Sequence, residues 1–372
     1  MTAILPARLG QRLEEVDTPA LILDLDAFEA NIRRLNEALA GRSVRVRAHA
    51  KTHKCPEIAL RQIAAGAIGV CCQKVSEAEA MVDGGVGDVL VSNEVVGASK
   101  LARLARLAKR ARIGICVDHV LQVDALGAAA RNEGVQLDVY VEIDVGAHRC
   151  GVAPGAPALE VARRISSAPG LRFAGLQAYQ GSAQHVRTMT ERKERIGIAI
   201  EAARTTRELI ASSGIACPIV TGAGSGSFMF EAASGVYDEL QPGSYIFMDA
   251  DYAKNEWAPP LPRFEHSLFV LACVMSTPVP GRAVLDAGLK ASSVDSGLPT
   301  VWGRPGLTYA RASDEHGVID VQPGSTAPAL GEKLLLVPGH CDPTVNLYDW
   351  YVCMRGGVVE ALWPITARGA LA

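Results

Sequence analysis

Long apolar segments are missing from this 372-residue sequence, since no hydrophobic run approaches the roughly 20 residues that a helix needs to cross a bilayer. Residues 1–16 also lack the charged-then-apolar order of a secretory signal. We therefore expect neither a membrane partner nor export, and we predict a cytoplasmic protein.

An excess of charge of either sign is also missing. Lys and Arg number 37 and Asp and Glu number 40, which gives a formal net charge of −3 at pH 7. Nucleic acids and anionic membranes bind proteins that concentrate positive charge. Neither is therefore expected as a partner.

Paired cysteines are missing as well. The nine cysteines form no CxxC pair and no compact spacing, and only Cys71 and Cys72 are adjacent. This excludes a small disulfide-rich fold and favours reduced, mostly buried thiols in the cytosol.

The sequence does contain an alternation of short β-branched runs with longer segments of helical period, over residues 44–247. This pattern is typical of repeated βα units around a parallel sheet. Eight parallel strands close a (β/α)8 TIM barrel, with an open doubly wound sheet as the alternative. The strands are predicted at 44–49, 68–72, 89–92, 113–117, 137–143, 172–179, 218–221 and 245–247, and helices among them at 99–110, 157–167 and 187–212.

After residue 249 the helical period fades. Alternating runs at 267–275, 283–286, 333–337 and 358–363 are interrupted by Pro and Gly, which predicts a second, mainly β domain. Residues 18–39 are typical of a strand followed by a helix, with Asp26 as the expected N-cap. The predicted division is a barrel at 20–250 and a β domain made of residues 1–19 together with 251–372.

A lysine stands at the end of the first predicted barrel strand, where such barrels carry their reactive residues. Lys51 lies in the polar segment 49–54, His-Ala-Lys-Thr-His-Lys. Burial would lower the pKa of its amine, and a neutral amine forms an imine with a carbonyl. An ordinary surface lysine is the alternative.

A glycine-rich segment follows the seventh predicted strand. Residues 221–227 read Thr-Gly-Ala-Gly-Ser-Gly-Ser and do not fit the Walker pattern, because no Gly-Lys-Ser/Thr follows. Small residues leave backbone N–H groups free for a phosphate, and barrels often bind phosphate near strands seven and eight. A flexible turn is the alternative. Together with Lys51, this segment suggests a phosphorylated aldehyde as cofactor.

Several motifs together resemble the fold-type III pyridoxal-phosphate enzymes, and within them the group of D-threonine aldolases and 3-hydroxy-D-aspartate aldolases. The resemblance covers nearly the whole chain. It is carried by segments 17–20 (DTPA), 49–54 (HAKTHK), 70–78 (VCCQKVSEA), 142–144 (EID), 149–151 (RCG), 175–179 (GLQAY), 221–227, 243–245 (GSY), 314–317 (DEHG) and 338–344 (PGHCDPT).

The resemblance implies an alanine racemase-like fold, in which a (β/α)8 barrel is joined to a β domain that carries a metal site. It also implies pyridoxal 5'-phosphate on Lys51 and a homodimer in which the partner's β domain completes each active site. The cofactor residues that it implies are Gln73, Arg149 and Tyr179 around the ring, and Thr221, Gly222, Ala223, Gly224, Gly243 and Ser244 at the phosphate.

Two candidate metal ligands stand two residues apart near the C-terminus. In an extended segment His340 and Asp342 would point to the same side and could share an ion, although a buried histidine beside a turn aspartate is the simpler explanation. The resemblance implies a divalent metal site here, and this pair with waters suits Mn²⁺ or Mg²⁺. Related dehydratases tend to have a cysteine in place of Asp342. Cys341, between the two, is expected to point the other way.

The implied reaction cleaves the Cα–Cβ bond of a D-3-hydroxy amino acid to glycine and an aldehyde, and it needs a base for the 3-hydroxyl proton. His53 is the first candidate, because an extended strand end would present it on the same side as Lys51. His185 is the second, and either could be structural. His49 is predicted to be a packing residue, and the role of His316 stays open.

Other functions are compatible with these residues. A D-serine dehydratase-like enzyme would expel the hydroxyl, a racemase would need a second acid or base, and related barrels bind pyridoxal phosphate without catalysis. The Asp342 ligand favours the aldolase. D-threonine and 3-hydroxy-D-aspartate both remain possible substrates, because the second carboxylate of hydroxyaspartate needs a cation such as Arg187 or Arg311, which the sequence does not place.

Replacement of Lys51 by arginine tests the assignment of the cofactor. We expect Lys51→Arg to be colourless and without measurable activity after addition of the vitamin B6 aldehyde, because a guanidinium does not form the imine. The absorbance spectra of the two purified proteins provide the measurement. Identical spectra and turnover would exclude this role for Lys51.

Overall fold

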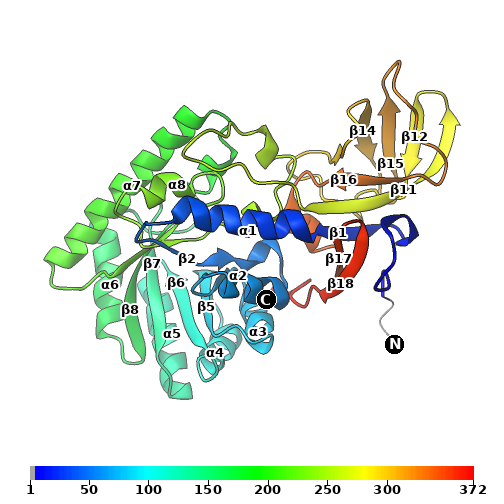
Figure 1. Cartoon of the computed structure of the whole chain (residues 1–372). Helices are drawn as coiled ribbons and strands as arrows, with labels where there is room; N and C mark the ends of the chain where they lie inside the picture. Colours follow the sequence, from blue (N-terminus) through cyan, green and yellow to red (C-terminus); the bar gives the residue numbers. More distant parts are fainter. Residues whose placement is uncertain (1–4) are drawn as a thin grey trace.

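The alternating segments form a closed parallel barrel in the computed structural model, which describes residues 5–372 (Figure 1). The strands are β2 (Arg45–Val46), β3 (Ala48–His49), β4 (Val70–Cys72), β5 (Asp88–Glu94), β6 (Arg112–Val117), β7 (Leu137–Glu142), β8 (Leu171–Ala178), β9 (Ile219–Gly222) and β10 (Glu239–Leu240). β2 and β3 are halves of one strand, and they pair with β10 and β4 respectively, so the sheet closes on itself. The predicted barrel is confirmed.

The eighth barrel strand differs from the prediction. It is β10, whereas the predicted strand at 245–247 overlaps a 3-10 turn, η4 (Ser244–Ile246). Tyr245, Ile246 and Phe247 are fully buried, so their apolar character was recognised correctly. A short buried apolar run has no periodicity that separates a strand from a helical turn, which explains the error.

Helices cover the outside of the barrel between successive strands (Figure 1). The predicted helices at 99–110, 157–167 and 187–212 correspond to α4, α6 and α7. In chain order the helices that follow the barrel strands are α2 (Pro56–Ala64), α3 (Val75–Asp83), α4 (Ala98–Leu107), α5 (Val120–Glu133), α6 (Ala156–Ser167), α7 (Met189–Ser212) and α8 (Phe228–Ala232).

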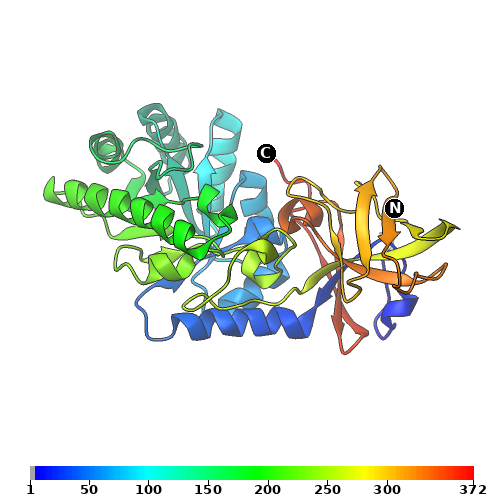
Figure 2. The same ribbon diagram turned by 90° about the horizontal axis from the view of Figure 1, so that it is seen from above.

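The helix before the barrel, α1 (Leu25–Leu39), connects the two lobes of the molecule. Figure 2 shows it along one side of the barrel, with its beginning at the β domain. Its apolar face contacts α8 and η4. The N-cap is Asp24 and not the predicted Asp26, because the Asp24 carboxylate accepts a hydrogen bond from the N–H of Ala27 at 3.1 Å. Asp26 lies in the first turn and pairs with Arg355.

The second lobe is a β domain, as predicted from the alternating runs. Its strands follow the order β14-β15-β12-β11-β1-β17-β18, with β16 beside β11 and β13 beside β16. They are β1 (Ala20–Asp24), β11 (Leu268–Val279), β12 (Arg282–Leu285), β13 (Thr300–Val301), β14 (Leu307–Ala312), β15 (Gly317–Val321), β16 (Lys333–Val337), β17 (Trp350–Arg355) and β18 (Val358–Pro364).

The predicted domain boundary at residue 20 places β1 in the wrong lobe. β1 pairs antiparallel with β11 and parallel with β17, so it is a central strand of the β domain. The preceding residues also join this domain, since the N–H of Gly10 donates to the carbonyl oxygen of Val359 at 2.9 Å. Residues 1–4 of the predicted β domain lie outside the described residues.

A buried arginine stabilises the closure of the barrel. Arg47, between β2 and β3, is 2% exposed, and its Nε lies 2.9 Å from a carboxylate oxygen of Glu239 at the start of β10. A second ion pair, of 2.5 Å, joins it to Asp88 at the start of β5. Loss of one partner from such a buried pair typically costs ~3–5 kcal/mol, because it leaves an uncompensated charge.

All nine cysteines are free thiols, and seven of them are buried. This confirms the expectation of mostly buried, unpaired cysteines.

Among the described residues, no helix combines the length and the apolar character that a membrane span requires.

Gly175 in β8 is a position where the fold requires glycine. Its φ is +140°, and a Cβ there would lie 1.8 Å from the carbonyl oxygen of Ile219. We expect Gly175→Ala to lower the free energy of unfolding by ~2–4 kcal/mol, since overpacking and backbone strain each cost about 1–3 kcal/mol. Chemical denaturation measures the change.

Gly197 provides the matched control. It is exposed on α7, and a Cβ there would meet nothing within 4 Å. We expect Gly197→Ala to raise the free energy of unfolding by about 0.5–1 kcal/mol through helix propensity. Equal effects of the two substitutions would contradict the steric explanation for Gly175.

Candidate active site

A cavity of about 440 Å³ opens at the carboxyl ends of the barrel strands, where they face the β domain. Loops after β3, β4, β7, β8, β9 and β10 contribute to its wall, together with the residues around α9 (Cys341–Val345) of the β domain. The structure thus gathers residues from distant parts of the chain. The predicted residues that line the cavity are Lys51, Gln73, Arg149, Tyr179, His185, Ala223, Gly224, Gly243, Ser244, His340 and Asp342.

Lys51 lies in a 3-10 turn, η2 (Ala50–Thr52), directly after β3. Its Nζ is 2.8 Å from Oδ2 of Asp342, so this ion pair joins the barrel to the β domain. The Asp342 carboxylate raises the pKa of Lys51 above its usual value, and the opposing effect of burial is smaller. The expectation that burial would lower this pKa was wrong, because the nearby negative charge outweighs desolvation.

His53 lies outside the cavity. It was the first candidate base because an extended strand end would present it on the same side as Lys51, but the chain forms a 3-10 turn here. Successive side chains in a 3-10 turn are rotated by about 120°, so residues i and i+2 face different directions. In a strand, residues i and i+2 face the same side. His53 is fully buried, and its Nδ1 accepts a hydrogen bond from the N–H of Cys55 at 3.1 Å. Burial lowers the pKa of His53 to about 3, so its ring is neutral.

His185 does line the cavity, at the end of the turn η3 (Ser182–His185). Its Nδ1 is 2.7 Å from Oδ2 of Asp251. Burial works against ionisation of Asp251, yet hydrogen bonds from Arg187 and His185 hold the pKa of this carboxyl below its usual range. Because a carboxylate only accepts hydrogen bonds, Nδ1 carries a proton, and Nε2 has no hydrogen-bond partner among residues 5–372.

The two predicted metal ligands both line the cavity, but the segment is not extended. His340 is the N-cap of α9, and Asp342 lies in its first turn. Nδ1 of His340 is 2.8 Å from Oδ2 of Asp295, which leaves Nε2 as the free ligand atom. Metal-binding histidines usually have a carboxylate on their second nitrogen, so the donor set fits a divalent ion. Cys341 is buried and does not line the cavity, as expected.

The charge of Asp342 is set by its neighbours. Burial alone would favour its neutral form, but Lys51 and His340 hold the pKa of the Asp342 carboxyl well below its usual range. An ionised carboxylate beside a free imidazole nitrogen is the chemistry that a hard or borderline divalent cation requires.

One wall of the cavity carries a network around Gln73. Its Nε2 lies 2.9 Å from Nε2 of His49 and 3.2 Å from the carbonyl oxygen of Ser92. The prediction that His49 only packs was wrong, since its ring lines the cavity. Burial, and then the charge of Lys51, lower the pKa of His49 well below its usual value, so the ring is neutral.

The wall of the cavity also includes Arg149 and Tyr179. The guanidinium carbon of Arg149 is 5.9 Å from the centre of the Tyr179 ring, at the limit of a cation–π contact. Burial raises the pKa of Tyr179, so its phenol stays protonated. Both predicted residues therefore face the same space as Lys51.

The glycine-rich segment forms a tight cradle. Ala223 adopts a left-handed conformation with φ of 70°, and a Cβ on Gly224 would lie 2.5 Å from Oε1 of Gln184. Within residues 5–372, the buried N–H groups of Gly224 and Ser225 donate to no protein acceptor. Free, convergent N–H donors fit an anion such as a phosphate.

Thr221 and Gly222, also predicted at the phosphate, lie just behind the cavity and do not line it. The hydroxyl of Thr221 accepts a hydrogen bond from Nε2 of Gln241 at 2.8 Å. A Cβ on Gly222 would lie 2.3 Å from the carbonyl oxygen of Ala178, so this glycine permits close approach of β8.

Sequence reasoning missed a group of buried amides at the base of the cavity. Gln177 and Gln241 are 2% and 4% exposed, and they exchange hydrogen bonds of 2.8 and 3.1 Å. Gln177 interrupts an apolar strand, which was the available signal.

His316, whose role was open, does not line the cavity. The other lining residues that were not predicted are Thr52, Ser92, Ala147, Gly181, Ser182, Gln184, Ser225 and Tyr252.

Comparison with known families agrees with this architecture. The family model of the alanine racemase N-terminal domain matches residues 23–251, which include the barrel, and that of a putative serine dehydratase domain matches residues 267–354 in the β domain. The chain therefore belongs to the alanine racemase N-terminal domain family, with a dehydratase-type second domain.

Individual relatives are similar over nearly their whole length. A D-threonine aldolase from Arthrobacter sp. is 54% identical, over 98% of this chain and 96% of the relative. A 3-hydroxy-D-aspartate aldolase from Paracoccus denitrificans is 47% identical, over 98% and 95%. The crystal structure of D-threonine aldolase from Filomicrobium marinum superimposes with a TM-score of 0.98 at 53% identity, covering 99% of this chain and all of that one.

Proposed function

We propose that this protein is an aldolase that depends on pyridoxal 5'-phosphate and a divalent metal, and that it cleaves D-3-hydroxy amino acids to glycine and an aldehyde. The observation that carries the proposal is the convergence of Lys51, His185 and the His340/Asp342 pair on one cavity. The relatives with the highest identities quoted above bear aldolase names, which agrees with it.

The cofactor would be held at three places. Lys51 supplies the amine for its aldehyde, the cradle around Gly224 and Ser244 supplies donors for its phosphate, and Gln73, Arg149 and Tyr179 border its ring. When bound, pyridoxal phosphate supplies an electron sink for a bond broken at Cα. The role of the protein is to decide which bond breaks.

The metal would be held by Nε2 of His340 and by the carboxylate of Asp342, with Mn²⁺ or Mg²⁺ as the expected ion. Such an ion supplies Lewis acidity toward an oxygen ligand. Oδ2 of Asp342, one of the two oxygens that could bind the ion, pairs with Lys51. The charge of Lys51 and the occupancy of the metal site are therefore coupled.

His185 is the base in this proposal, in place of His53. Asp251 fixes its ring through Nδ1, and Arg187 in turn holds Asp251, so Nε2 can accept a proton from the 3-hydroxyl group without reorientation. Asp251 is itself fixed beside the metal ligands, because its N–H donates to the carbonyl oxygen of Gly339 at 3.2 Å.

D-threonine is the favoured substrate. The second carboxylate of 3-hydroxy-D-aspartate would require a free cation, and the two arginines considered for this role are not in the cavity wall. Arg187 forms hydrogen bonds with Asp251 and Asn255, and Arg311 lies on β14 of the β domain.

The proposal also includes a homodimer, which rests on the sequence resemblance, and a cytoplasmic location, which the nine free thiols support.

The proposed reaction and its metal dependence are tested together by product analysis. With D-threonine we expect glycine and acetaldehyde, whereas ammonia and a keto acid would indicate a dehydratase. EDTA should abolish turnover and Mn²⁺ should restore it, because Asp342 and His340 then hold the ion again. Undiminished turnover after chelation would refute the metal role. His340→Ala is the control, which we expect added Mn²⁺ not to restore.

The choice of base is tested by two matched substitutions. We expect His185→Gln to lower kcat by about 10²–10⁴-fold, the usual contribution of a general base, while cofactor absorbance is retained. His53→Gln should lower the thermal stability but leave kcat within a few fold, because His53 lies outside the cavity. Steady-state kinetics on both variants decide between them. The reverse ranking would restore His53 as the base.

A further inference from the structure

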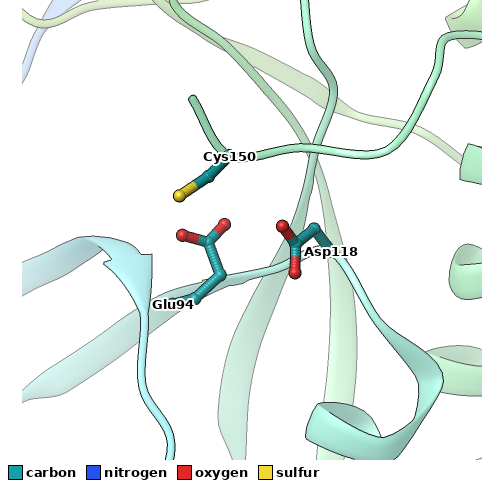
Figure 3. A group of neighbouring side chains, drawn as sticks. All are labelled: Glu94, Asp118 and Cys150. Atoms are coloured by element: carbon teal, nitrogen blue, oxygen red, sulfur yellow. The ribbon is translucent and has the colours of Figure 1, made fainter. Parts of the chain in front are cut away.

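A second group of potential ligands lies at the ends of three neighbouring barrel strands (Figure 3). Glu94 ends β5, Asp118 follows β6 and Cys150 lies in the loop after β7. Their ligand atoms all lie within 4.8 Å of one another. In Figure 3 the Cys150 sulfur and the Asp118 carboxylate point toward the carboxylate of Glu94. None of the three lines the cavity of the proposed active site.

A fourth acidic residue beside this group has an unsatisfied oxygen. Glu142, the last residue of β7, is only 5% exposed, and its Oε2 has no hydrogen-bond partner in the described part of the chain. Its carboxyl group lies against that of Glu94, both of whose oxygens are also buried without partners. Buried carboxylate oxygens without partners are costly, and three of them meet at this one point.

The charges of the group are not balanced by protein cations. Three carboxylates, those of Glu94, Asp118 and Glu142, are opposed by the guanidinium of Arg149, whose Nη2 is 3.8 Å from Oε1 of Glu142. A divalent cation would offset part of the negative charge that these groups carry once they are ionised. Asp118 is already oriented, because it accepts hydrogen bonds from the N–H of Gly151 and from Gln122.

We propose that Glu94, Asp118 and Cys150, with Glu142 beside them, form a second divalent-cation site, separate from His340 and Asp342. Two kinds of donor, carboxylate oxygen and sulfur, favour a borderline ion such as Co²⁺ or Zn²⁺ over the harder Mg²⁺ and Mn²⁺. When the ion binds, a metal–sulfur bond forms, and the thiol proton of Cys150 is released to water. No electron is transferred.

A proton shared between Glu94 and Glu142 is the competing explanation. Burial and the neighbouring Glu94 raise the pKa of Glu142 to about 8, which is consistent with such sharing. However, one shared proton joins only two of the three oxygens, and the thiol of Cys150 offers Glu94 no more than a weak hydrogen bond. An ion can bind to all of these atoms at once.

The position of the site assigns the ion a structural role. Cys150 is the direct neighbour of Arg149, which lines the active-site cavity and was predicted beside the cofactor ring. The loop is already fixed at its base, where the N–H of Val152 donates to the carbonyl oxygen of Glu142 at 3.0 Å. A cation at Cys150 would fix a second point of the loop, next to Arg149, and hold Arg149 in place.

Metal counting on the holoenzyme tests the proposal. After equilibration with Co²⁺ and removal of the free ion, we expect elemental analysis to find two ions per chain in the wild type. Cys150→Ser and Glu94→Gln, which preserve shape, should each lower the count to one. Cys273→Ser changes a partly exposed thiol far from the group and should leave two. Anomalous diffraction from Co²⁺ crystals should show a peak between Glu94 and Cys150.

His340→Ala separates this proposal from the proposed function. It should remove the ion of the active site and leave the anomalous peak at Glu94 and Cys150. A failed aldolase assay would therefore not change the interpretation of the anomalous peak at Glu94 and Cys150. A wild-type count of one, lost in His340→Ala and unchanged in Cys150→Ser, would overturn the second site and favour the shared proton. A second ion found at any other position would overturn it equally.

Discussion

The ion pair between Lys51 and Asp342 is the contact on which the candidate active site depends. Lys51 comes from the end of the first barrel strand and Asp342 from the β domain, so the 2.8 Å contact exists only when the two lobes are docked. The docking is secured by β1, which pairs within the β domain and leads directly into α1 along the barrel. The cavity is thus a product of the interface and not of either sheet alone.

Carboxylates orient both histidines of the cavity in the same way. Asp251 holds Nδ1 of His185 and Asp295 holds Nδ1 of His340, at 2.7 and 2.8 Å. Among residues 5–372, Nε2 of each ring has no hydrogen-bond partner, and in the proposed function it would accept a proton in His185 and bind the metal ion in His340. Burial lowers the pKa of both His53 and His49, so these two rings are neutral.

Much of the fold followed from periodicity, and the errors have local causes. The βα alternation located the strands from β3 to β9, but the apolar run at 245–247 was mistaken for the last strand, since burial without periodicity does not specify a conformation. β1 was assigned to the wrong lobe because a strand's sequence does not reveal its partners. The polar residues Gln177 and Gln241 were missed because an isolated amide carries no motif.

The sequence by itself determined the chemical groups that are present: the lysine after the first barrel strand, the glycine cradle and the histidine–aspartate pair near the C-terminus. Only the tertiary structure decided which of them meet. A 3-10 turn in place of a strand end turned His53 away from Lys51 and left His185 in the cavity, because backbone geometry, and not spacing along the chain, sets the direction of a side chain. The gathering of Glu94, Asp118 and Cys150 likewise follows from the parallel pairing of β5, β6 and β7, which no single segment encodes.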